Sequence, residues 1–464
     1  MKKAIFMLLA LCAALPLDAQ SLRTGDELLD RAFALAIRTV DDNTDGLLLK
    51  AGGGYGGEWT RDIAINSWNG ASLLRPEAAR HSLWSVTVDD RRRVGHQYWD
   101  KIIWVVAAYD HYLVCGDRAF LDEAYTCARN TMEELEQTAF ERRYGLFMGP
   151  AVFQDGIAGY DEPVCDPENE SSYVLDHKNA AAIKCLSTNC TYYAAYRALA
   201  AMSRIAGDGR ATSFDKRAKA LRTAIRKNFY HPSEHRLDYL IDHRGAAHPY
   251  QEALGVAFAG LNGVVTPAEM GGIVRHARTS EFGIPCVFPD FPRFSPERPG
   301  RHNATIWPFV NAFYADAALR AGERAVFESE LRNLARLAVE YGPDNFQEVY
   351  NRLTGEPDGG WQRGKKWWLN PDQTWSATGY LRLFLLDVFG MRFSEEGVTF
   401  RPAGLGSAER IELSGIPYRG ALLDIVLTGR GDRIARCTID GKQVAKAFIP
   451  ASAQGRIRME IDLK

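Results

Sequence analysis

The stretch "GGYGGEWTRD", Gly53–Asp62, combines four glycines with aromatic residues, an arginine and an aspartate. Glycine-rich loops often bind phosphate, yet this one lacks the lysine and the following serine or threonine of a P-loop, and no strand pattern precedes it. The glycines are therefore interpreted as backbone bends that let Trp59, Arg61 and Asp62 project together. Arg61 offers a fork of donors and Asp62 two acceptor oxygens, a combination that suits adjacent sugar hydroxyls. The alternative is a local ion pair that caps a helix expected to begin near Ile63.

Bulk composition narrows the class of protein. The chain has 464 residues, of which 46% are hydrophobic and 25% charged, as in an ordinary globular protein of several domains. The formal net charge of −2 gives no broad attraction to nucleic acid or anionic lipid. Many of the Trp, Tyr and Phe residues lie in polar loops, a distribution typical of sugar-binding clefts, although each could equally fill a seam between helices.

The first 19 residues have the pattern of a secretory signal peptide. Lys2 and Lys3 form a basic start, Ala4–Leu15 an apolar core, and Ala19 a small residue at the cleavage position. The apolar run is too short to cross a membrane comfortably, and no later stretch is long and apolar enough. We therefore expect a periplasmic or secreted protein without a membrane span.

Seven cysteines remain after this segment, an odd number at irregular spacing. Such a pattern is neither a disulfide framework nor a zinc site, so no metal and no cofactor are expected. Cys185 and Cys190 could pair in an oxidising compartment, and buried free thiols are the alternative.

Helical periodicity dominates from about residue 22 to 390. Apolar residues recur at i, i+3, i+4 and i+7 in "DELLDRAFALAIRTV", "KIIWVVAAYDHYLVCGD" and the run that follows. Further helices are predicted at Asn179–Ala206, Phe214–Phe229, Glu252–Leu261, Pro267–Ala277, Pro308–Ala321, Arg324–Tyr341 and Gln373–Phe389. Many are apolar on more than one face, which a closed double ring of paired helices would explain because the inner ring is buried on two sides.

The pattern changes near Met391. Alternating β-type runs follow, and Asp440-Gly441 is a hairpin-turn signal. Residues 391–464 are therefore predicted to form a small C-terminal β-sandwich domain.

Two loop carboxylates are candidates for acid–base chemistry. Asp155, in "GPAVFQDGIAGYDEP", is flanked by Phe153 and Gly156, and a carboxyl group in apolar surroundings can act as a general acid. Glu348, in "NFQEVYNRLTGEPDGG", lies between aromatic residues and could be a general base. The alternatives are an Asp-Gly turn and a buried structural carboxylate.

A third group of residues mixes aromatic and polar side chains near expected helix starts. For any single member, a helix cap or a core aromatic is the competing interpretation. The candidate sugar contacts from these segments are Trp104, Lys178, Asn189, His302, Trp307 and Trp368.

Together these motifs resemble the (α/α)6-toroid glycoside hydrolases, the six-hairpin glycosidases that include glucoamylase, trehalase and the processing α-glucosidases. "WTRD" at Trp59–Asp62 is similar to the segment that holds the terminal sugar in glucoamylases, and "EVYNRLTGE" at Glu348–Glu356 to the segment carrying the general base in processing α-glucosidases and trehalases. The segment around Asp155 lies where these families place the general acid. It departs from their usual form, so Asp161 or Glu162 could hold that role instead.

The resemblance implies an all-α (α/α)6 toroid at 20–390, after the signal peptide at 1–19 and before the β-sandwich at 391–464. It implies an exo-acting, inverting glycoside hydrolase that removes a terminal α-linked sugar, with α-glucosides favoured, from an oligosaccharide or glycan. The alternatives are an α-L-rhamnosidase or α-mannosidase of the same fold, a polysaccharide lyase using Tyr160, His177 or His302 as its base, and a non-catalytic glycan-binding protein.

Overall fold

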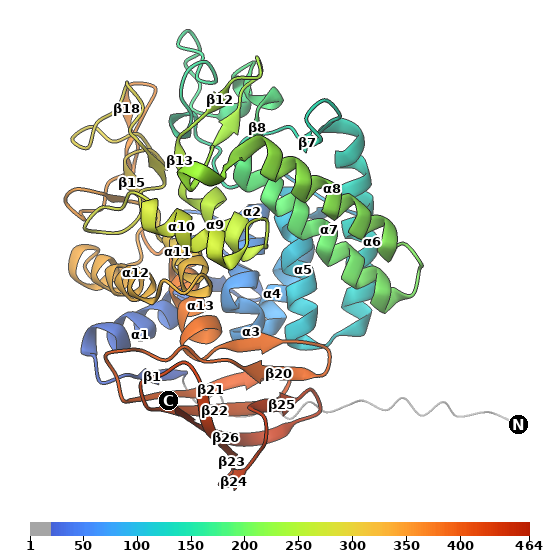
Figure 1. Ribbon diagram of the computed structural model, residues 1–464, viewed down its shortest axis with the longest axis vertical. Helices are drawn as coiled ribbons and strands as arrows, with labels where there is room; N and C mark the ends of the chain where they lie inside the picture. Colours follow the sequence, from blue (N-terminus) through green and yellow to red (C-terminus); the bar gives the residue numbers. More distant parts are fainter. Residues whose placement is uncertain (1–19) are drawn as a thin grey trace, which may run out of the picture.

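Six helices form a closed inner ring in the computed structural model, which describes residues 20–464 (Figure 1). The predicted signal peptide at 1–19 lies outside the described residues. Neighbouring inner helices contact one another in the order α2, α5, α7, α9, α11, α13 and back to α2. Their bounds are α2 Thr60–Asn66, α5 Lys101–Cys115, α7 Leu186–Ala206, α9 Ala253–Leu261, α11 Pro308–Arg320 and α13 Thr374–Arg382.

A second set of helices packs outside this ring. The outer helices are α1 Glu27–Asp42, α4 Pro76–Ser85, α6 Arg118–Thr138, α8 Ala211–Phe229, α10 Pro267–His276 and α12 Arg324–Arg336. Each contacts at least one inner helix, for example α8 against α7 and α12 against α11. The inner helices are buried on most faces, as in α11, whereas α8 and α12 bury a narrower stripe, which in α12 also includes Glu330. The double ring expected from the sequence is therefore present.

Several helices continue as π-helical turns. α2 runs into Ser67–Ala71 and the short α3 Ser72–Leu74, α12 into Leu337–Tyr341, and α13 into Leu383–Val388. The sequence prediction was close at most helix ends. It was wrong at Asn179, because helix α7 begins only at Leu186, after a 3₁₀ turn at Ala180–Ala182 and a strand at Lys184–Cys185. It also missed α4, a ten-residue helix with a weakly amphipathic sequence.

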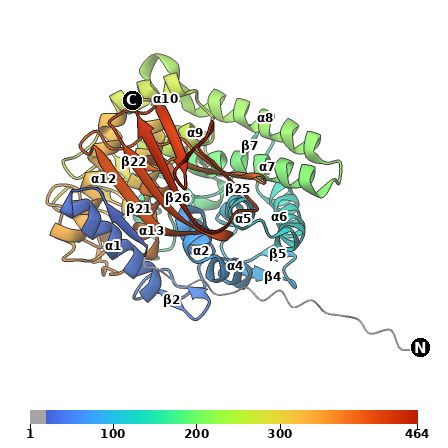
Figure 2. The same cartoon turned by 90° about the horizontal axis from the view of Figure 1, so that it is seen from below.

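Two sheets cover the lower end of the ring (Figure 1 and Figure 2). The larger has the strand order β1-β21-β22-β26-β23-β24, with β22 and β26 parallel and the other pairs antiparallel. The smaller has the order β19-β20-β25. The strands of the larger sheet are β1 Ser21–Arg23, β21 Arg410–Tyr418, β22 Gly420–Thr428, β23 Ile434–Ile439, β24 Lys442–Gln443 and β26 Gln454–Leu463. The smaller sheet consists of β19 Met391–Phe393, β20 Gly397–Phe400 and β25 Phe448–Pro450.

The change from helices to strands occurs at Met391, and the hairpin at Asp440-Gly441 is present with both residues at positive φ. One strand was not anticipated. β1 pairs with β21 in the register Leu22↔Leu413, so the first described residues join the sheet built from the last ones. Phe33 of α1, Phe384 and Ile425 of β22 also belong to one hydrophobic core. Treating 391–464 as a separate β-sandwich domain stays a prediction.

Short two- and three-stranded ribbons and long loops occupy the opposite end of the ring (Figure 1). They include β8 Lys184–Cys185, β12 Ala247–His248, β13 Gln251–Glu252, β14 Val287–Phe288, β15 Thr305–Ile306, β16 Tyr350–Asn351, β17 Trp361–Gln362 and β18 Lys365–Lys366. Several inner helices begin at this end, directly after such a ribbon, as α11 does after β15. The loops that precede inner helices are therefore brought together there.

The junction between helices and sheets constrains one glycine. Gly390 has φ +65°, and a Cβ atom there would lie 2.0 Å from the carbonyl oxygen of Arg401. Gly207, which ends α7, has φ +72° with open space around it. We expect Gly390→Ala to lower the free energy of unfolding clearly more than Gly207→Ala, for which left-handed backbone strain alone costs about 1–2 kcal/mol. Denaturant unfolding of the two variants measures the difference, and equal losses would contradict the packing constraint.

Candidate active site

A cavity of about 230 Å³ lies at the loop end of the ring. This volume is at the small end for ligand pockets and suits a single sugar ring better than a chain of them. The lining residues come from the loops before α2, α7, α11 and α13 and from the first turns of α2 and α13. They are Ala51, Tyr55, Trp59, Arg61, Asp62, Asp155, Gly156, Ser172, Tyr173, Arg301, Glu348, Gln362, Trp367, Trp368 and Trp375.

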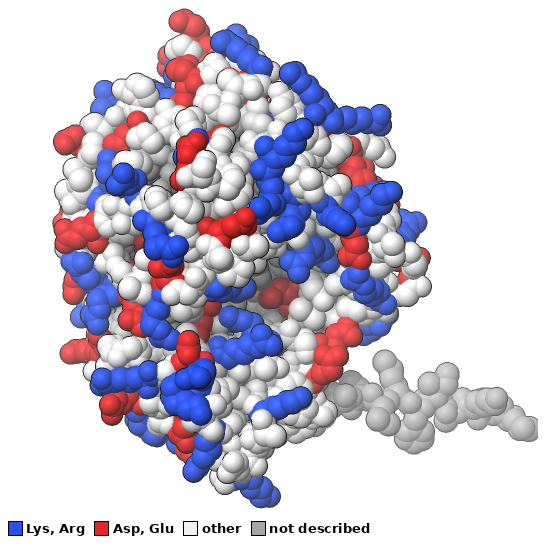
Figure 3. Space-filling view, viewed as in Figure 1, with Lys and Arg blue, Asp and Glu red and all other residues white. Residues whose placement is uncertain are grey.

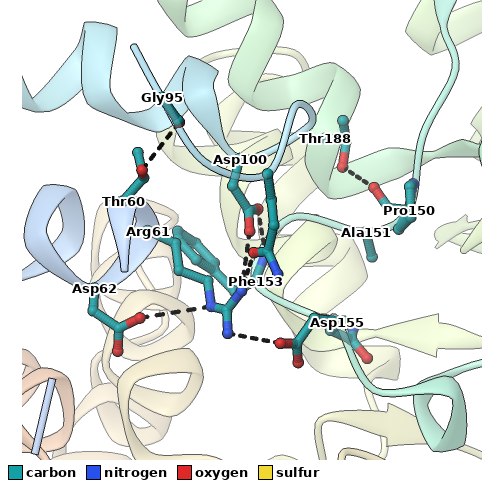
Figure 4. Close-up of polar contacts among 12 residues, drawn as sticks. Thr60, Arg61, Asp62, Gly95, Asp100, Pro150, Ala151, Phe153, Asp155 and Thr188 are labelled. Carbon is teal, nitrogen blue, oxygen red and sulfur yellow. Dashed lines mark hydrogen bonds and ion pairs between the residues drawn. The ribbon is translucent and has the colours of Figure 1, made fainter. Parts of the chain in front are cut away.

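Arg61 is the centre of one wall (Figure 4). Its Nη2 lies 2.8 Å from Asp155 Oδ2, its Nη1 3.5 Å from Asp100 Oδ2 and its Nε 3.6 Å from Asp62 Oδ2. The guanidinium also lies over the Trp59 ring, 4.7 Å from its centroid. The local Arg–Asp contact is thus real, but Arg61 also binds a carboxylate 94 positions away in the chain. It is more than a helix cap.

The single positive charge of Arg61 is therefore shared among three carboxyl groups. Burial raises the pKa of Asp62 to about 8, because the charges of Glu348, Asp155 and Asp100 add to the desolvation and outweigh Arg61. Burial likewise raises the pKa of Asp100 to about 6, against the stabilising effect of Arg61 and of the Phe153 N–H. Asp62 is accordingly protonated at neutral pH. This wall of the cavity holds a proton.

The backbone that presents Asp155 is held firmly. Asp100 Oδ1 accepts a hydrogen bond from Phe153 N at 3.0 Å, and Phe153 has a φ of +70°, which a bulky residue adopts only where its surroundings impose it. Asp155 O accepts from Val174 N at 2.8 Å. The next residue, Gly156, packs so closely that a Cβ atom would lie 2.5 Å from Gln362 Oε1. Asp155 is thus fixed by contacts on both sides.

Glu348 lies on another wall beside a different arginine. Its Oε1 accepts from Arg301 Nη2 at 2.5 Å, and both side chains are buried. Its Oε2 is buried and has no hydrogen-bond partner among residues 20–464. The Nε1 atoms of Trp59 and Trp375 are likewise buried and unpartnered within the described chain. Since buried polar groups are normally paired, these three atoms are available to a ligand.

The glycine stretch has a specific packing role. Tyr55 N donates to Gly52 O, which closes a tight turn, so the expected bend is present. These positions also require glycine because their backbone lies very close to the loop before α13. A Cβ atom on Gly54 would lie 2.1 Å from Asn370 Oδ1, and one on Gly52 would lie 2.9 Å from Gln373 Nε2. The glycines therefore let the loops before α2 and α13 meet, which places Trp59, Arg61 and Asp62 on the cavity wall.

Both candidate catalytic carboxylates and four of the nine candidate sugar contacts line this cavity. The four contacts are Trp59, Arg61, Asp62 and Trp368. The structure also brings in residues that the sequence analysis did not select, above all Tyr55, Tyr173, Arg301, Gln362 and Trp367. Arg301 stands directly before His302 in the "RHNATIWPF" segment, and His302 was chosen from that pair. No local signal separates Arg301 from its polar neighbours His302, Asn303 and Thr305.

Three aromatic candidates do not line this cavity. Trp104 is fully buried and donates from Nε1 to Leu83 O at 2.7 Å, so it is a core residue. His302 is buried and stacks on Trp307 with ring centroids 3.8 Å apart. The ring centroid of Trp307 in turn lies 5.3 Å from that of Trp375, which lines the cavity. His302 and Trp307 support the cavity wall without lining it.

Two polar candidates also lie outside the cavity lining. The Lys178 side chain is 76% exposed and lies 3.7 Å from Asp166 Oδ2, outside the cavity. Asn189 is buried and binds the backbone of Phe147 and Cys185, so it joins the start of α7 to a neighbouring ribbon. Such hydrogen bonds from a buried side chain to the backbone are a structural role.

The competing acid and base residues are also absent from the lining. Asp161 is bound by His248 Nδ1 at 2.8 Å, and Glu162 is exposed. Tyr160 is fully buried and donates to Gln154 O, while His177 bonds to Asp166 N and Ser171 O. None of these side chains, nor His302, lines the cavity described here. The geometry thus favours Asp155 over Asp161 and Glu162.

The cavity lining contains no cysteine, and the described residues form no metal site. Cys185 and Cys190 are both buried free thiols. Among residues 20–464, no group of three or more His, Cys, Asp or Glu side chains is arranged to hold a metal ion. In the same part of the chain, no helix has the length and apolar character needed to cross a membrane.

Comparison with known proteins identifies the class. Residues 90–376 match the family described as the mannosylglycerate hydrolase MGH1-like glycoside hydrolase domain. This match spans more than half of the chain and includes Asp155, Arg301 and Glu348. The chain belongs to this family and is a glycoside hydrolase.

Solved structures of toroid glycosidases are similar in fold. A sialidase matches with a TM-score of 0.71 at 14% identity, over 94% of this chain and 41% of its own. The GH63 mannosylglycerate hydrolase from Thermus thermophilus, in complex with Tris, matches with a TM-score of 0.57 at 15% identity, over 75% of this chain and 99% of its own. The GH78 family rhamnosidase of a Bacillus species matches with a TM-score of 0.59 at 15% identity, over 96% of this chain and 44% of its own. The chain thus spans less than half the length of the sialidase and the rhamnosidase. No curated protein sequence matches significantly.

The proton on Asp62 gives a test by pH. Since its pKa is about 8, Asp62 is neutral below that pH and gains a charge above it. We expect kcat/KM to fall about tenfold per pH unit above about pH 8 through a rise in KM. The Asp62→Asn variant, which stays neutral, should lack this rise in KM. Steady-state kinetics from about pH 6 to about pH 10 measure it, and an identical rise in both proteins would assign the effect to another group.

The two tryptophans Trp368 and Trp104 give a matched pair. Trp368 lines the cavity and is 69% exposed, so Trp368→Ala should raise KM several-fold and leave Tm unchanged. Trp104→Phe should leave KM unchanged and lower the free energy of unfolding by about 1–3 kcal/mol, because Leu83 O loses its buried donor. Kinetics and thermal unfolding of both variants separate the two roles. A higher KM in Trp104→Phe together with an unchanged KM in Trp368→Ala would contradict the placement of Trp104 in the core and of Trp368 in the cavity.

Proposed function

We propose that the protein is an exported, exo-acting, inverting glycosidase that removes a terminal α-linked sugar from an oligosaccharide or glycan. α-Glucosides are favoured by the resemblance of the "WTRD" and "EVYNRLTGE" segments to α-glucosidases. The family description and the structural neighbours add mannosides and rhamnosides as the other substrates to test. One observation carries the proposal: Asp155 and Glu348, far apart in sequence, line one small cavity beside two different arginines.

The distribution of charge supports different roles for the two carboxyl groups. Arg61 is shared by Asp155, Asp62 and Asp100, so that group carries excess negative charge and readily holds a proton. Arg301 is paired with Glu348 alone among the cavity carboxylates. Asp155 is assigned as the general acid and Glu348 as the general base because both line the cavity and stand in the segments that resemble the acid- and base-bearing segments of toroid glycosidases.

In this mechanism a water molecule loses a proton to Glu348 while its oxygen bonds to the anomeric carbon. The glycosidic C–O bond breaks, and the leaving oxygen takes the proton of Asp155. Glu348 ends protonated and Asp155 ionised, and both return to their starting states by exchange with solvent. Inversion predicts that the two carboxyl groups lie about 6.5–9.5 Å apart, which leaves room for the water.

The shape of the cavity supports attack at a chain end. Its volume of about 230 Å³ accommodates one sugar ring. Arg61 and Asp62 would bind hydroxyls of that ring. Tyr55, Tyr173 and Trp368 contribute aromatic surface to the lining and would contact the ring faces of the sugar or its leaving group.

Export rests on the sequence of residues 1–19. We propose cleavage after Ala19 and a periplasmic or secreted location. N-terminal sequencing of the mature protein, recovered from separate cell fractions, tests both points; a mature protein that retains Met1 in the cytoplasm would refute them.

Removal of either carboxyl group tests the assignment. We expect Asp155→Asn and Glu348→Gln each to lower kcat by about 10²–10⁴-fold, the usual contribution of a general acid or base. Asp161→Asn is a matched control that should keep nearly full kcat, because Asp161 binds His248 outside the cavity. Full activity in both cavity variants would show that the site is wrong.

The stereochemistry is tested by following the released sugar by NMR. A screen of aryl α-glucosides, α-mannosides and α-L-rhamnosides identifies the substrate, and the first anomer to appear should be β-configured from an α-D-glycoside. Release of the α-anomer would indicate retention. An unsaturated product absorbing in the near ultraviolet would instead indicate a lyase.

A further inference from the structure

Arg301, in the cavity wall, binds both a carboxylate and a backbone carbonyl oxygen. Its Nη2 donates to Glu348 Oε1 at 2.5 Å, and its Nη1 donates to Gly359 O at 3.3 Å. The side chain is 5% exposed, and its face lies 5.9 Å from the centre of the Trp367 ring. The guanidinium is thus held at several points and has one carboxylate partner among the described residues.

The backbone on either side of Arg301 is constrained as well. Arg301 N donates to Trp361 O at 3.2 Å, and Trp361 N donates to Pro299 O at 2.7 Å. Gly360 has φ +69°, and a Cβ atom there would lie 2.6 Å from Arg301 N. The loop before β15 and the loop that carries β17 are therefore locked together at this residue.

Glu348 in turn has two unlike oxygens. Oε1 is occupied by Arg301, whereas Oε2 is buried, lacks a hydrogen-bond partner within residues 20–464, and belongs to a side chain that lines the cavity. A buried carboxylate oxygen without a partner is costly unless a ligand or water satisfies it. Oε2 is the free acceptor of this carboxylate.

We propose that Arg301 is the positioning residue of the general base: anchored on Gly359 O, it occupies Oε1 of Glu348 and leaves Oε2 as the atom that takes the proton from the attacking water. This inference rests on the proposed role of Glu348. Because the guanidinium fork bridges Gly359 O and Glu348 Oε1, Arg301 limits the orientations of the carboxylate and so the direction from which water attacks.

Other groups that act on Glu348 are few. Tyr55 and Asp62 face it electrostatically from the loop before α2 and from α2 itself. Asp62 holds its proton below about pH 8, and burial, with the charge of Glu348 next, raises the pKa of Tyr55 above its usual value. Arg301 is therefore the cation paired directly with Glu348.

The test compares Arg301→Gln and Arg301→Lys with the control Arg352→Gln. Arg352 forms an Arg–carboxylate pair with Asp290 at 2.6 Å on the neighbouring loop and does not line the cavity. For Arg301→Gln we expect kcat to fall about 10²-fold with a much smaller change in KM, and the acidic limb of kcat against pH to move up by about 1–3 units. Arg301→Lys keeps the charge but not the fork, so kcat should fall while the acidic limb stays within about half a unit.

The control should leave kcat and the acidic limb unchanged and affect only Tm. If Arg301→Gln does not fold, Arg301→Lys still tests the positioning role, because full kcat in that variant would overturn the proposal. A rise in KM with kcat and the acidic limb unchanged would make Arg301 a sugar-binding residue instead. Full activity of Glu348→Gln would refute the proposed base itself. An inactive Glu348→Gln together with an Arg301→Gln that matches the control would refute only the role of Arg301.

Discussion

Closure of the inner ring between α2 and α13 is the constraint on which the rest of the structure depends. These helices come from opposite ends of the helical region, and a buried hydrogen bond from Thr378 Oγ1 to Asn66 Oδ1, at 2.9 Å, joins them. Above this contact, the glycine stretch packs against Asn370 and Gln373 so closely that side chains at Gly52 and Gly54 would collide. Ring closure is what brings the Arg61 wall next to the loop of Glu348.

The cavity that results contains two arginines with different surroundings. Arg61 is divided among three carboxylates, whereas Arg301 serves Glu348. In a buried site, where charges are poorly screened, the shared charge of Arg61 leaves Asp62 and Asp100 with raised pKa values, whereas Glu348 has a guanidinium of its own. The two walls of the cavity therefore differ in charge, although their carboxyl groups are chemically alike.

Balanced charge also characterises the outer surface. Acidic and basic side chains are interspersed over the face shown in Figure 3, and the formal net charge is −2. Such a surface has no strong attraction for polyanions. Recognition of substrate therefore rests on the cavity and its aromatic lining, where Tyr55, Trp59 and Trp368 combine apolar rings with polar atoms. This arrangement suits the alternating hydroxyl and C–H surfaces of a sugar.

The sequence by itself determined most of the helices, the change to strands at Met391 and the two candidate catalytic carboxylates of the cavity. Helical periodicity and hairpin turns are local, and Asp155, Glu348, Arg61 and Asp62 stand in short segments of unusual composition. Only the tertiary structure decided which polar and aromatic residues face the cavity. The direction in which the side chains of Trp104, Trp307 and His302 point depends on contacts with other segments, such as the hydrogen bond from Trp104 to Leu83 O. The same reason explains β1, which pairs with a strand nearly four hundred residues later, and Arg301, whose importance follows from contacts with Glu348 and Gly359 that no local pattern encodes.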